Sequence, residues 1–77
     1  MKRIDSLKPN TPVLLKFFRS TEEATFLAIV GEGDERRARF VQHDDAIGLF
    51  EWEAYRFQGR WAYGTSAERL SLVAILD

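Results

Sequence analysis

The sequence predicts an all-β fold, a small antiparallel barrel of about five or six strands. Short runs rich in β-branched and aromatic residues recur along the chain, separated by turns of glycine, proline and aspartate. Both tryptophans and both tyrosines lie within residues 50–64. Gln58-Gly59 divides that aromatic stretch in two, as the turn of a tight β-hairpin does.

The chain has 77 residues, enough for one domain, and residues 1–11 are expected to be a lead-in segment. This segment ends in a turn that places Asn10 where a positive φ is tolerated. Residues 13–18 form the first predicted strand. Because side chains alternate along a strand, one of Phe17 and Phe18 is expected to point outward.

Residues 20–30 allow two interpretations. Ser20 and Glu23 have the spacing of a helical capping box, and Gly31 would then end a short helix. Residues 25–30, however, are rich in β-branched and aromatic side chains, which favour a strand. We predict the strand.

A turn of glycines and acids at 31–35 leads to a strand over 36–42 and then to a polar loop over 42–45. Residues 47–57 again allow two interpretations, because some of their apolar residues have helical spacing. Gly48 inside that helix would cost about 1 kcal/mol relative to alanine. The alternation of apolar and charged residues later in the segment favours a strand.

Residues 65–68 carry another capping signature, and we predict one short helical (3-10) turn there. Residues 70–76 form the last predicted strand, with one face made of Leu70, Leu72, Ala74 and Leu76 and the other of Val73 and Ile75. A turn before the first strand, then a meander, then a short helical turn resembles the order of elements in SH3-like barrels. That resemblance implies an architecture and no function.

The turn at Gln58-Gly59 sets the register of the hairpin and hence its two faces. Phe57 is expected opposite Arg60, and Arg56 opposite Trp61, so that Arg56 lies over the indole ring. One face, the predicted core face, then carries Phe50, Trp52, Ala54, Arg56, Trp61 and Tyr63. The other, predicted to point outward, carries Glu51, Glu53, Tyr55, Phe57, Arg60 and Ala62.

The preceding strand agrees with this assignment, because its parity places Ala38 and Phe40 toward the core. Its outward residues are arginines, and those of the next strand are glutamates. A shift of one residue in register would destroy both matches. The outward charges expected to lie beside one another are Arg37, Arg39, Glu51 and Glu53.

Composition limits the classes of function. There are 11 lysines and arginines against 12 aspartates and glutamates, which disfavours binding of nucleic acid through its phosphates. The chain has no cysteine, so it forms no disulfide or cysteine metal site. The longest apolar run, residues 72–76, is too short to cross a bilayer. We therefore expect a cytoplasmic protein with no membrane association.

Few residues form a pattern that suggests catalysis or metal binding. His43 is the single histidine, and with Asp44 and Asp45 it lacks the further ligands that a transition metal needs. Gly31 and Gly33 are not followed by the residues of a phosphate-binding loop, so they are interpreted as turn residues. We expect no cofactor, no metal and no catalytic site within one chain. An enzyme would require a site shared between subunits.

The hypothesis that follows is a non-enzymatic protein-interaction module that self-associates or docks on another protein. An outward face with aromatic residues more often marks protein contacts than chemistry. Nucleic-acid binding is the alternative, with arginines on the phosphates and Tyr55 and Phe57 stacking on bases. The candidate binding residues are Tyr55, Phe57, Arg60, Arg37, Arg39, Glu51 and Glu53.

Overall fold

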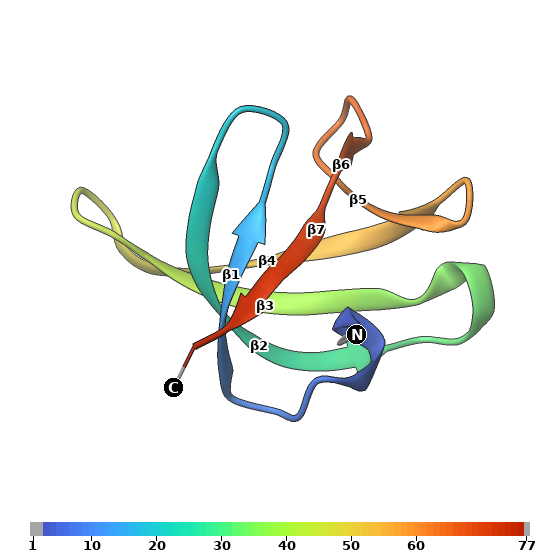
Figure 1. Cartoon of the computed structure of the whole chain (residues 1–77), viewed down its shortest axis with the longest axis horizontal. Coiled ribbons are helices and arrows are strands. Elements are labelled where there is room, and N and C mark those ends of the chain that lie inside the picture. Colours follow the sequence, from blue (N-terminus) through green and yellow to red (C-terminus); the bar gives the residue numbers. More distant parts are fainter. Residues whose placement is uncertain (1–2, 77) are drawn as a thin grey trace.

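Seven antiparallel strands form one sheet that curls into a nearly closed barrel in the computed structural model, which describes residues 3–76 (Figure 1). The strands follow the order β6-β5-β4-β3-β2-β1-β7, so that the last strand returns to pair with the first. Two 3-10 helices accompany them, η1 (Ile4–Ser6) and η2 (Gly33–Glu35). The strands are β1 (Thr11–Lys16), β2 (Thr21–Val30), β3 (Arg37–Asp44), β4 (Gly48–Phe57), β5 (Arg60–Tyr63), β6 (Glu68–Arg69) and β7 (Ser71–Ile75).

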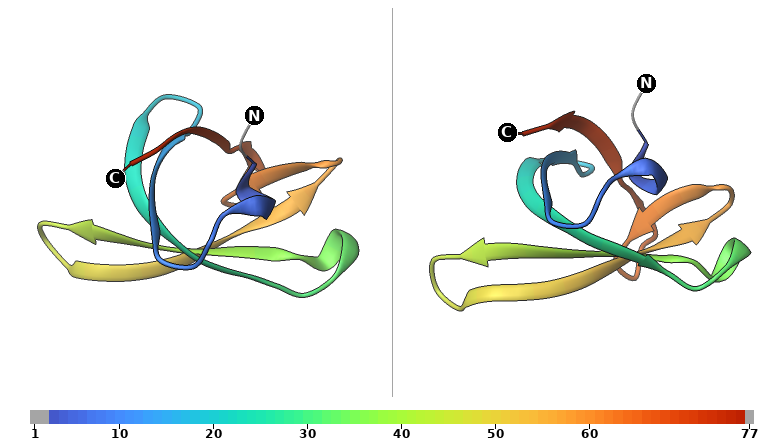
Figure 2. Two further views of the ribbon diagram at one scale, coloured as in Figure 1. Left: turned by 60° about the horizontal axis from the view of Figure 1, so that its bottom comes forward. Right: turned by 90° about the horizontal axis from the view of Figure 1, so that it is seen from below.

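The small antiparallel barrel of SH3-like type predicted from the sequence is confirmed, with seven strands in place of five or six. Both ambiguous segments are strands, β2 and β4. A bulge between Phe26 and Ala28 interrupts the register of β2 with β3, and such a bulge bends the strand that carries it. Figure 2 shows β2 curling away from the β3–β4 hairpin, whose end projects from the barrel.

The β4–β5 hairpin has the predicted register, with Phe57 opposite Arg60 and Arg56 opposite Trp61. Gln58 has a φ of 51° and Gly59 a φ of 77°, as the two central residues of a type I′ turn require. This turn matches the twist of the flanking strands. The guanidinium of Arg56 lies 5.0 Å from the centroid of the Trp61 ring, as predicted.

The core is aromatic at its centre. Phe40 is fully buried, stacks on Trp52 at 4.8 Å between ring centroids and meets Phe26 edge-on at 5.6 Å. The predicted core residues Ala38, Phe40, Ala54 and Trp61 are all buried, whereas Phe50, Trp52 and Tyr63 are partly buried. The lead-in segment contributes as well, because Ile4 of η1 belongs to the same cluster.

The predicted helical turn before the last strand is wrong. Residues 64–67 form a turn in which the amide of Ala67 donates to the carbonyl of Gly64 at 3.2 Å. Ala67 has a φ of 51°, outside the right-handed helical region, so a helix cannot continue past this single turn. Pairing of Glu68 with Tyr63 then makes a short strand, β6, of residues that local capping signals assign to a helix.

The predicted polar loop over 42–45 is also placed differently, because β3 continues to Asp44 and the turn occupies residues 45–47. Asp44 fixes this turn: its Oδ1 accepts hydrogen bonds from the amides of Ala46 at 2.8 Å and Ile47 at 3.1 Å. Within the described residues, no helix is long and apolar enough to cross a lipid bilayer.

Candidate functional site

The outward side chains of β3 and β4 lie on one continuous surface, here called the ribbon face. It comprises Arg37, Arg39, Val41 and His43 on β3 and Leu49, Glu51, Glu53, Tyr55 and Phe57 on β4. The eight-residue register between these strands is uninterrupted, so alternate residues of both stay on the same side of the sheet. Six of the seven predicted binding residues belong to this surface, and Arg60 adjoins it opposite Phe57.

Arg39 is at the centre of the ribbon face and contacts both glutamates. Its Nη2 lies 3.2 Å from Oε1 of Glu51, and its Nε lies 3.5 Å from Oε2 of Glu53. All three side chains are about half exposed, so water and salt screen these ion pairs and each contributes about 0–1 kcal/mol. The prediction of paired charges is thus confirmed for Arg39.

For Arg37 the prediction of a glutamate neighbour is wrong. Arg37 is opposite Tyr55, and its Nη1 donates to the carbonyls of Glu35 at 3.0 Å and Arg36 at 3.2 Å. The turn that contains η2 brings those carbonyls to the end of β3, within reach of the guanidinium. Arg37 therefore helps to hold this turn against the strand.

Tyr55 and Arg60 each form a hydrogen bond with the turn at 64–67. The hydroxyl of Tyr55 donates to the carbonyl of Gly64, and Nη2 of Arg60 donates to the carbonyl of Ala67 at 3.1 Å. The assignment of Ala62 to an exposed face is wrong, because this residue is fully buried. It pairs with Tyr55 on one side and Arg69 on the other, and these longer side chains flank its single methyl group.

Two exposed apolar residues near the β3–β4 turn were not among the predicted binding residues. Leu49 is 73% exposed and Ile47 is 70% exposed, against 40% for Phe57. The parity of β4 already places Leu49 on the face of Glu51 and Glu53, so the signal was present in the sequence. A groove of about 260 Å³ lies beside Leu49 and is lined in part by Pro12 and Val41.

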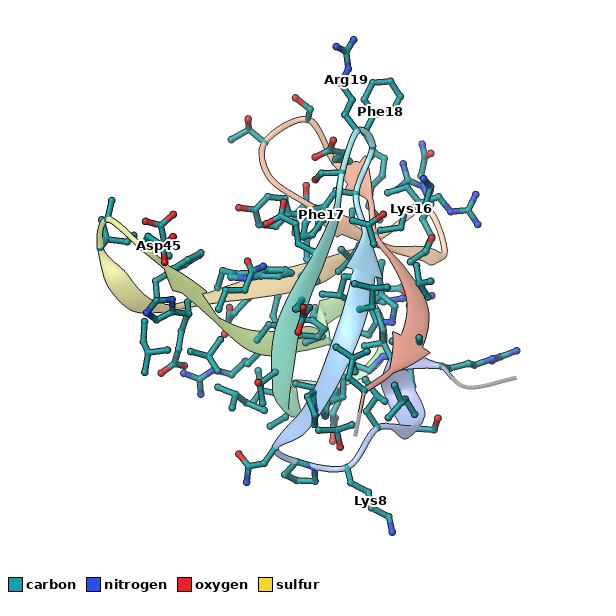
Figure 3. All side chains as sticks on the ribbon, turned by 60° about the vertical axis from the view of Figure 1, so that its left-hand side comes forward. Lys8, Lys16, Phe17, Phe18, Arg19 and Asp45 are labelled. Carbon is teal, nitrogen blue, oxygen red and sulfur yellow. The ribbon has the colours of Figure 1, made fainter. Side chains whose placement is uncertain are left out.

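The tip of the β1–β2 hairpin carries another exposed aromatic residue. Figure 3 shows Phe18 and Arg19 pointing away from the barrel, and Phe18 is 70% exposed. Phe17 is buried and packs on Trp52 and Tyr63 at 5.8 and 5.3 Å between centroids. One phenylalanine inward and one outward is the predicted arrangement.

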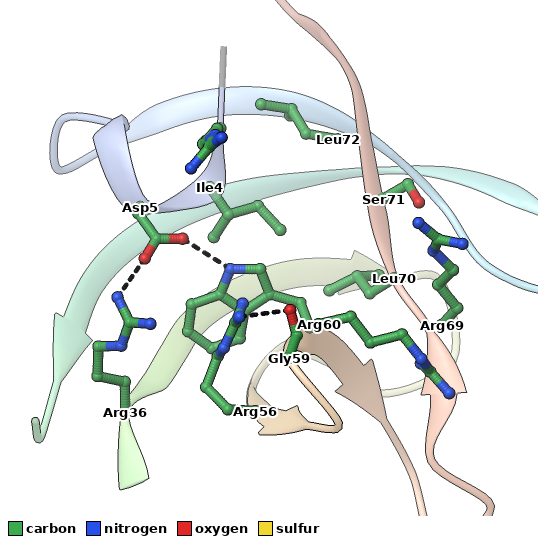
Figure 4. A pocket seen from close by; sticks show the side chains of 12 residues that line it. Ile4, Asp5, Arg36, Arg56, Gly59, Arg60, Arg69, Leu70, Ser71 and Leu72 are labelled. Carbon is green, nitrogen blue, oxygen red and sulfur yellow. Dashed lines mark hydrogen bonds and ion pairs between the residues drawn. The ribbon is translucent and has the colours of Figure 1, made fainter. Parts of the chain in front are cut away.

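A second concave surface, here called the arginine pocket, lies between η1, the β4–β5 hairpin and the start of β7 (Figure 4). It has a volume of about 530 Å³ and is lined by five arginines and one acidic residue. The arginines are Arg3, Arg36, Arg56, Arg60 and Arg69, and the acid is Asp5. Sequence reasoning missed this cluster because segments far apart in the chain supply its members.

No arrangement suited to a metal is found among residues 3–76, where no three His, Cys, Asp or Glu side chains gather. His43 lies near Asp45, with 3.8 Å between Nδ1 and Oδ1, and both side chains are largely exposed. That pair alone provides too few ligands for a transition metal.

The fold and these surfaces define a small antiparallel β-barrel with a mixed-charge ribbon face and a basic pocket. Comparison of the chain with protein-family models, with curated proteins and with solved structures finds no match. The proposals below therefore come from the described side chains themselves.

Proposed function

We propose that this protein is a non-enzymatic interaction module that self-associates through the ribbon face. The observation that supports this proposal is the distribution of residues along the outward side of β4. Exposed apolar side chains, Leu49 and Phe57, lie at its two ends, and charged side chains lie between them. Exposed apolar side chains on one face can mark a protein contact, and the charges between them can pair with charges of a partner.

The mixture of charges makes a second copy of this chain the partner that fits. A two-fold contact places one patch against the same patch of the partner, so the patch must complement itself. The ribbon face meets this condition because Arg39 and two glutamates lie side by side at its centre. In a face-to-face contact whose two-fold axis runs along the strands, β3 of each copy lies over β4 of the other. Arg39 of each copy then meets the glutamates of the other. The apolar ends then pack together, beside the groove at Leu49.

Light scattering coupled to size-exclusion chromatography, from low to high micromolar concentration, tests this proposal. We expect a mass that rises toward a dimer for the unchanged chain, and a monomer for Leu49→Asp and for Phe57→Ser. Phe18→Ser is the matched control, because it makes the same substitution as Phe57→Ser at a more exposed phenylalanine on a different hairpin tip.

Two results contradict self-association through this face. One is a chain that stays monomeric at high micromolar concentration. The other is a dimer that survives both ribbon-face substitutions but is lost in Phe18→Ser. Circular dichroism of each variant verifies that the fold is retained.

The ribbon face supports nucleic-acid binding less well than self-association. Its central arginine is engaged with two glutamates, and Arg37 is engaged with backbone carbonyls. Tyr55 is partly buried, which leaves less ring surface for stacking on a base. A gel-shift titration at low salt tests this alternative, and we expect no shift that depends on Arg39.

A further inference from the structure

The arginine pocket concentrates positive charge on a chain whose overall formal charge is −1. Five arginines and one aspartate line it, which gives +5 − 1 = +4. They come from separate parts of the fold: the start of η1, the connection between η2 and β3, the β4–β5 hairpin, and β6. Figure 4 shows Arg36 and Arg56 on one side of the pocket and Arg60 and Arg69 on the other. Like charges gathered in this way repel one another, which raises the free energy of the folded state.

The one acidic residue of the pocket is already engaged. Asp5 forms an ion pair with Arg36 through Oδ2, and its Oδ1 accepts a hydrogen bond from Nε1 of Trp61 at 2.9 Å. Within residues 3–76, the other four arginines of the pocket form no ion pair with a carboxylate. Those four are Arg3, Arg56, Arg60 and Arg69.

Two of these arginines are held in place by backbone contacts. Nη2 of Arg56 donates to the carbonyl of Gly59 at 2.7 Å, and Nη2 of Arg60 donates to the carbonyl of Ala67 at 3.1 Å. By contrast, Nε of Arg56 and Nη1 of Arg60 are buried and have no hydrogen-bond partner in the described part of the chain. A buried donor without a partner costs about 1–3 kcal/mol, and more for a charged group. Both nitrogens are covered by the protein itself, so a ligand in the pocket would contact other nitrogens of these guanidinium groups.

We propose that the arginine pocket binds a small anion that carries two or more phosphate groups. Pyrophosphate and the terminal phosphates of a nucleotide share this chemistry. A guanidinium donates two parallel hydrogen bonds to a phosphate, and several arginines match the several oxygens of a polyphosphate better than the two oxygens of one carboxylate. The volume of about 530 Å³ is large enough for more than a single phosphate and lies within the usual range of small-ligand pockets. This site goes beyond the proposed self-association and is separate from the centre of the ribbon face.

The pocket favours phosphate groups over the bases of a nucleic acid. Single-stranded nucleic acids bind proteins largely through aromatic rings on which their bases stack. Trp61 is the one aromatic residue among those lining the pocket, and it is only 6% exposed. Guanidinium groups lie over its ring, at 5.0 Å for Arg56 and 5.9 Å for Arg36. The pocket therefore offers charge and hydrogen-bond donors but no open aromatic surface.

Isothermal titration calorimetry with pyrophosphate, at an ionic strength held constant with sodium chloride, tests the proposal. We expect saturable binding with one site per chain. Arg69→Gln removes an exposed guanidinium that makes no hydrogen bond or ion pair within the described residues, so it is expected to fold normally. One lost charge-assisted contact is expected to weaken binding about tenfold. Arg3→Gln is expected to act in the same direction.

Arg19→Gln is the matched control, because it removes the same charge from the tip of the β1–β2 hairpin, outside the pocket. We expect it to bind pyrophosphate as the unchanged chain does. Absence of heat and of a pyrophosphate-dependent rise in melting temperature overturns the proposal. An equal loss in Arg19→Gln and Arg69→Gln also overturns it, since binding would then reflect overall charge.

Two further titrations identify the form of the anion. A nucleoside triphosphate that binds as tightly as pyrophosphate, with the same loss in Arg69→Gln, supports recognition of the phosphates alone. A single-stranded oligonucleotide that displaces pyrophosphate and binds much more tightly at the same ionic strength overturns the small-anion proposal in favour of a nucleic-acid site. Failure of this proposal leaves the proposed self-association untouched, because light scattering measures that property without any anion.

Discussion

Gln58 illustrates how one backbone angle constrains one residue. It occupies the first central position of the β4–β5 turn with a φ of 51°, and the described chain has two other non-glycine residues with positive φ, Asn10 and Ala67. The left-handed region is unfavourable for most L-residues, and asparagine tolerates it best among the non-glycine types. Asn-Gly is accordingly the preferred sequence for a type I′ turn. Glutamine is thus a poor choice for this position.

We expect Gln58→Asn to raise the free energy of unfolding by about 0.5 kcal/mol, since the turn loses part of its backbone strain. Gln58→Val is expected to lower it by about 1 kcal/mol or more, because a β-branched residue at positive φ is strained. Urea denaturation followed by far-UV circular dichroism measures both values. The same sign for the two substitutions would contradict a conformational effect at this position.

At the scale of the elements, alternate residues of β3 and β4 point to opposite faces of the sheet, and this alternation separates exposed residues from core residues. Arg39 and Phe40 are neighbours in the chain, yet Arg39 is exposed on the ribbon face and Phe40 is fully buried in the aromatic core. Strand alternation requires this, and for that reason the two faces of β3 and β4 were predictable from the sequence. Substitution of Arg39 should therefore change the free energy of unfolding much less than substitution of Phe40.

We expect Arg39→Ala to lower the free energy of unfolding by less than about 1 kcal/mol, and by still less at high salt. We expect Phe40→Ala to lower it by about 3–5 kcal/mol, because it leaves a cavity among packed rings. Urea titrations at two salt concentrations provide the comparison. A large cost for Arg39→Ala would show that its ion pairs hold the ribbon together, which would leave them less free to exchange with a second copy.

Parity identified which side of a strand a residue occupies, but not what covers that side. Ala62 was therefore assigned to the surface, although neighbours on both adjacent strands flank it. Arg37 was assigned a glutamate neighbour, although the carbonyls of a turn accept its hydrogen bonds. The capping signature at 65–68 describes a local preference, and pairing with β5 overrode it. In each case the deciding contact came from another segment.

At the scale of the whole molecule, the arginine pocket also depends on contacts between segments that are far apart in the sequence. Its five arginines are distributed between positions 3 and 69, and each is unremarkable in its local sequence. They meet only because β7 returns to β1 and η1 then packs against the β4–β5 hairpin. The strand pattern predicts a barrel, but the side chains that line this pocket depend on how the barrel closes. The ribbon face was therefore accessible to sequence reasoning, and the pocket was not.

Asp5 joins η1 to the rest of the barrel. It pairs with Arg36, which precedes β3, and accepts a hydrogen bond from Trp61 of β5, while the adjacent Ile4 is buried in the core. The carboxylate and Arg36 are each about one-third exposed, so solvent screens their attraction. The indole Nε1 belongs to a buried residue, and without Asp5 it would lose its acceptor. The hydrogen bond should therefore contribute more to closure than the ion pair.

Two substitutions at this position separate the contributions. Asp5→Asn keeps an oxygen that can accept from Trp61 but removes the charge, and we expect it to cost less than about 1 kcal/mol of unfolding free energy. Asp5→Ala removes both contacts and leaves a buried donor unsatisfied, and we expect a cost of about 2 kcal/mol. Urea denaturation measures both costs, provided that the slope of unfolding free energy against urea concentration is the same in each variant. Equal losses of unfolding free energy in the two variants would show that the ion pair, and not the hydrogen bond, holds η1 to the barrel. No loss in either variant would show that Ile4 alone anchors η1. The expected order, alanine well below asparagine, follows because one hydrogen bond to a buried indole connects η1 to β5.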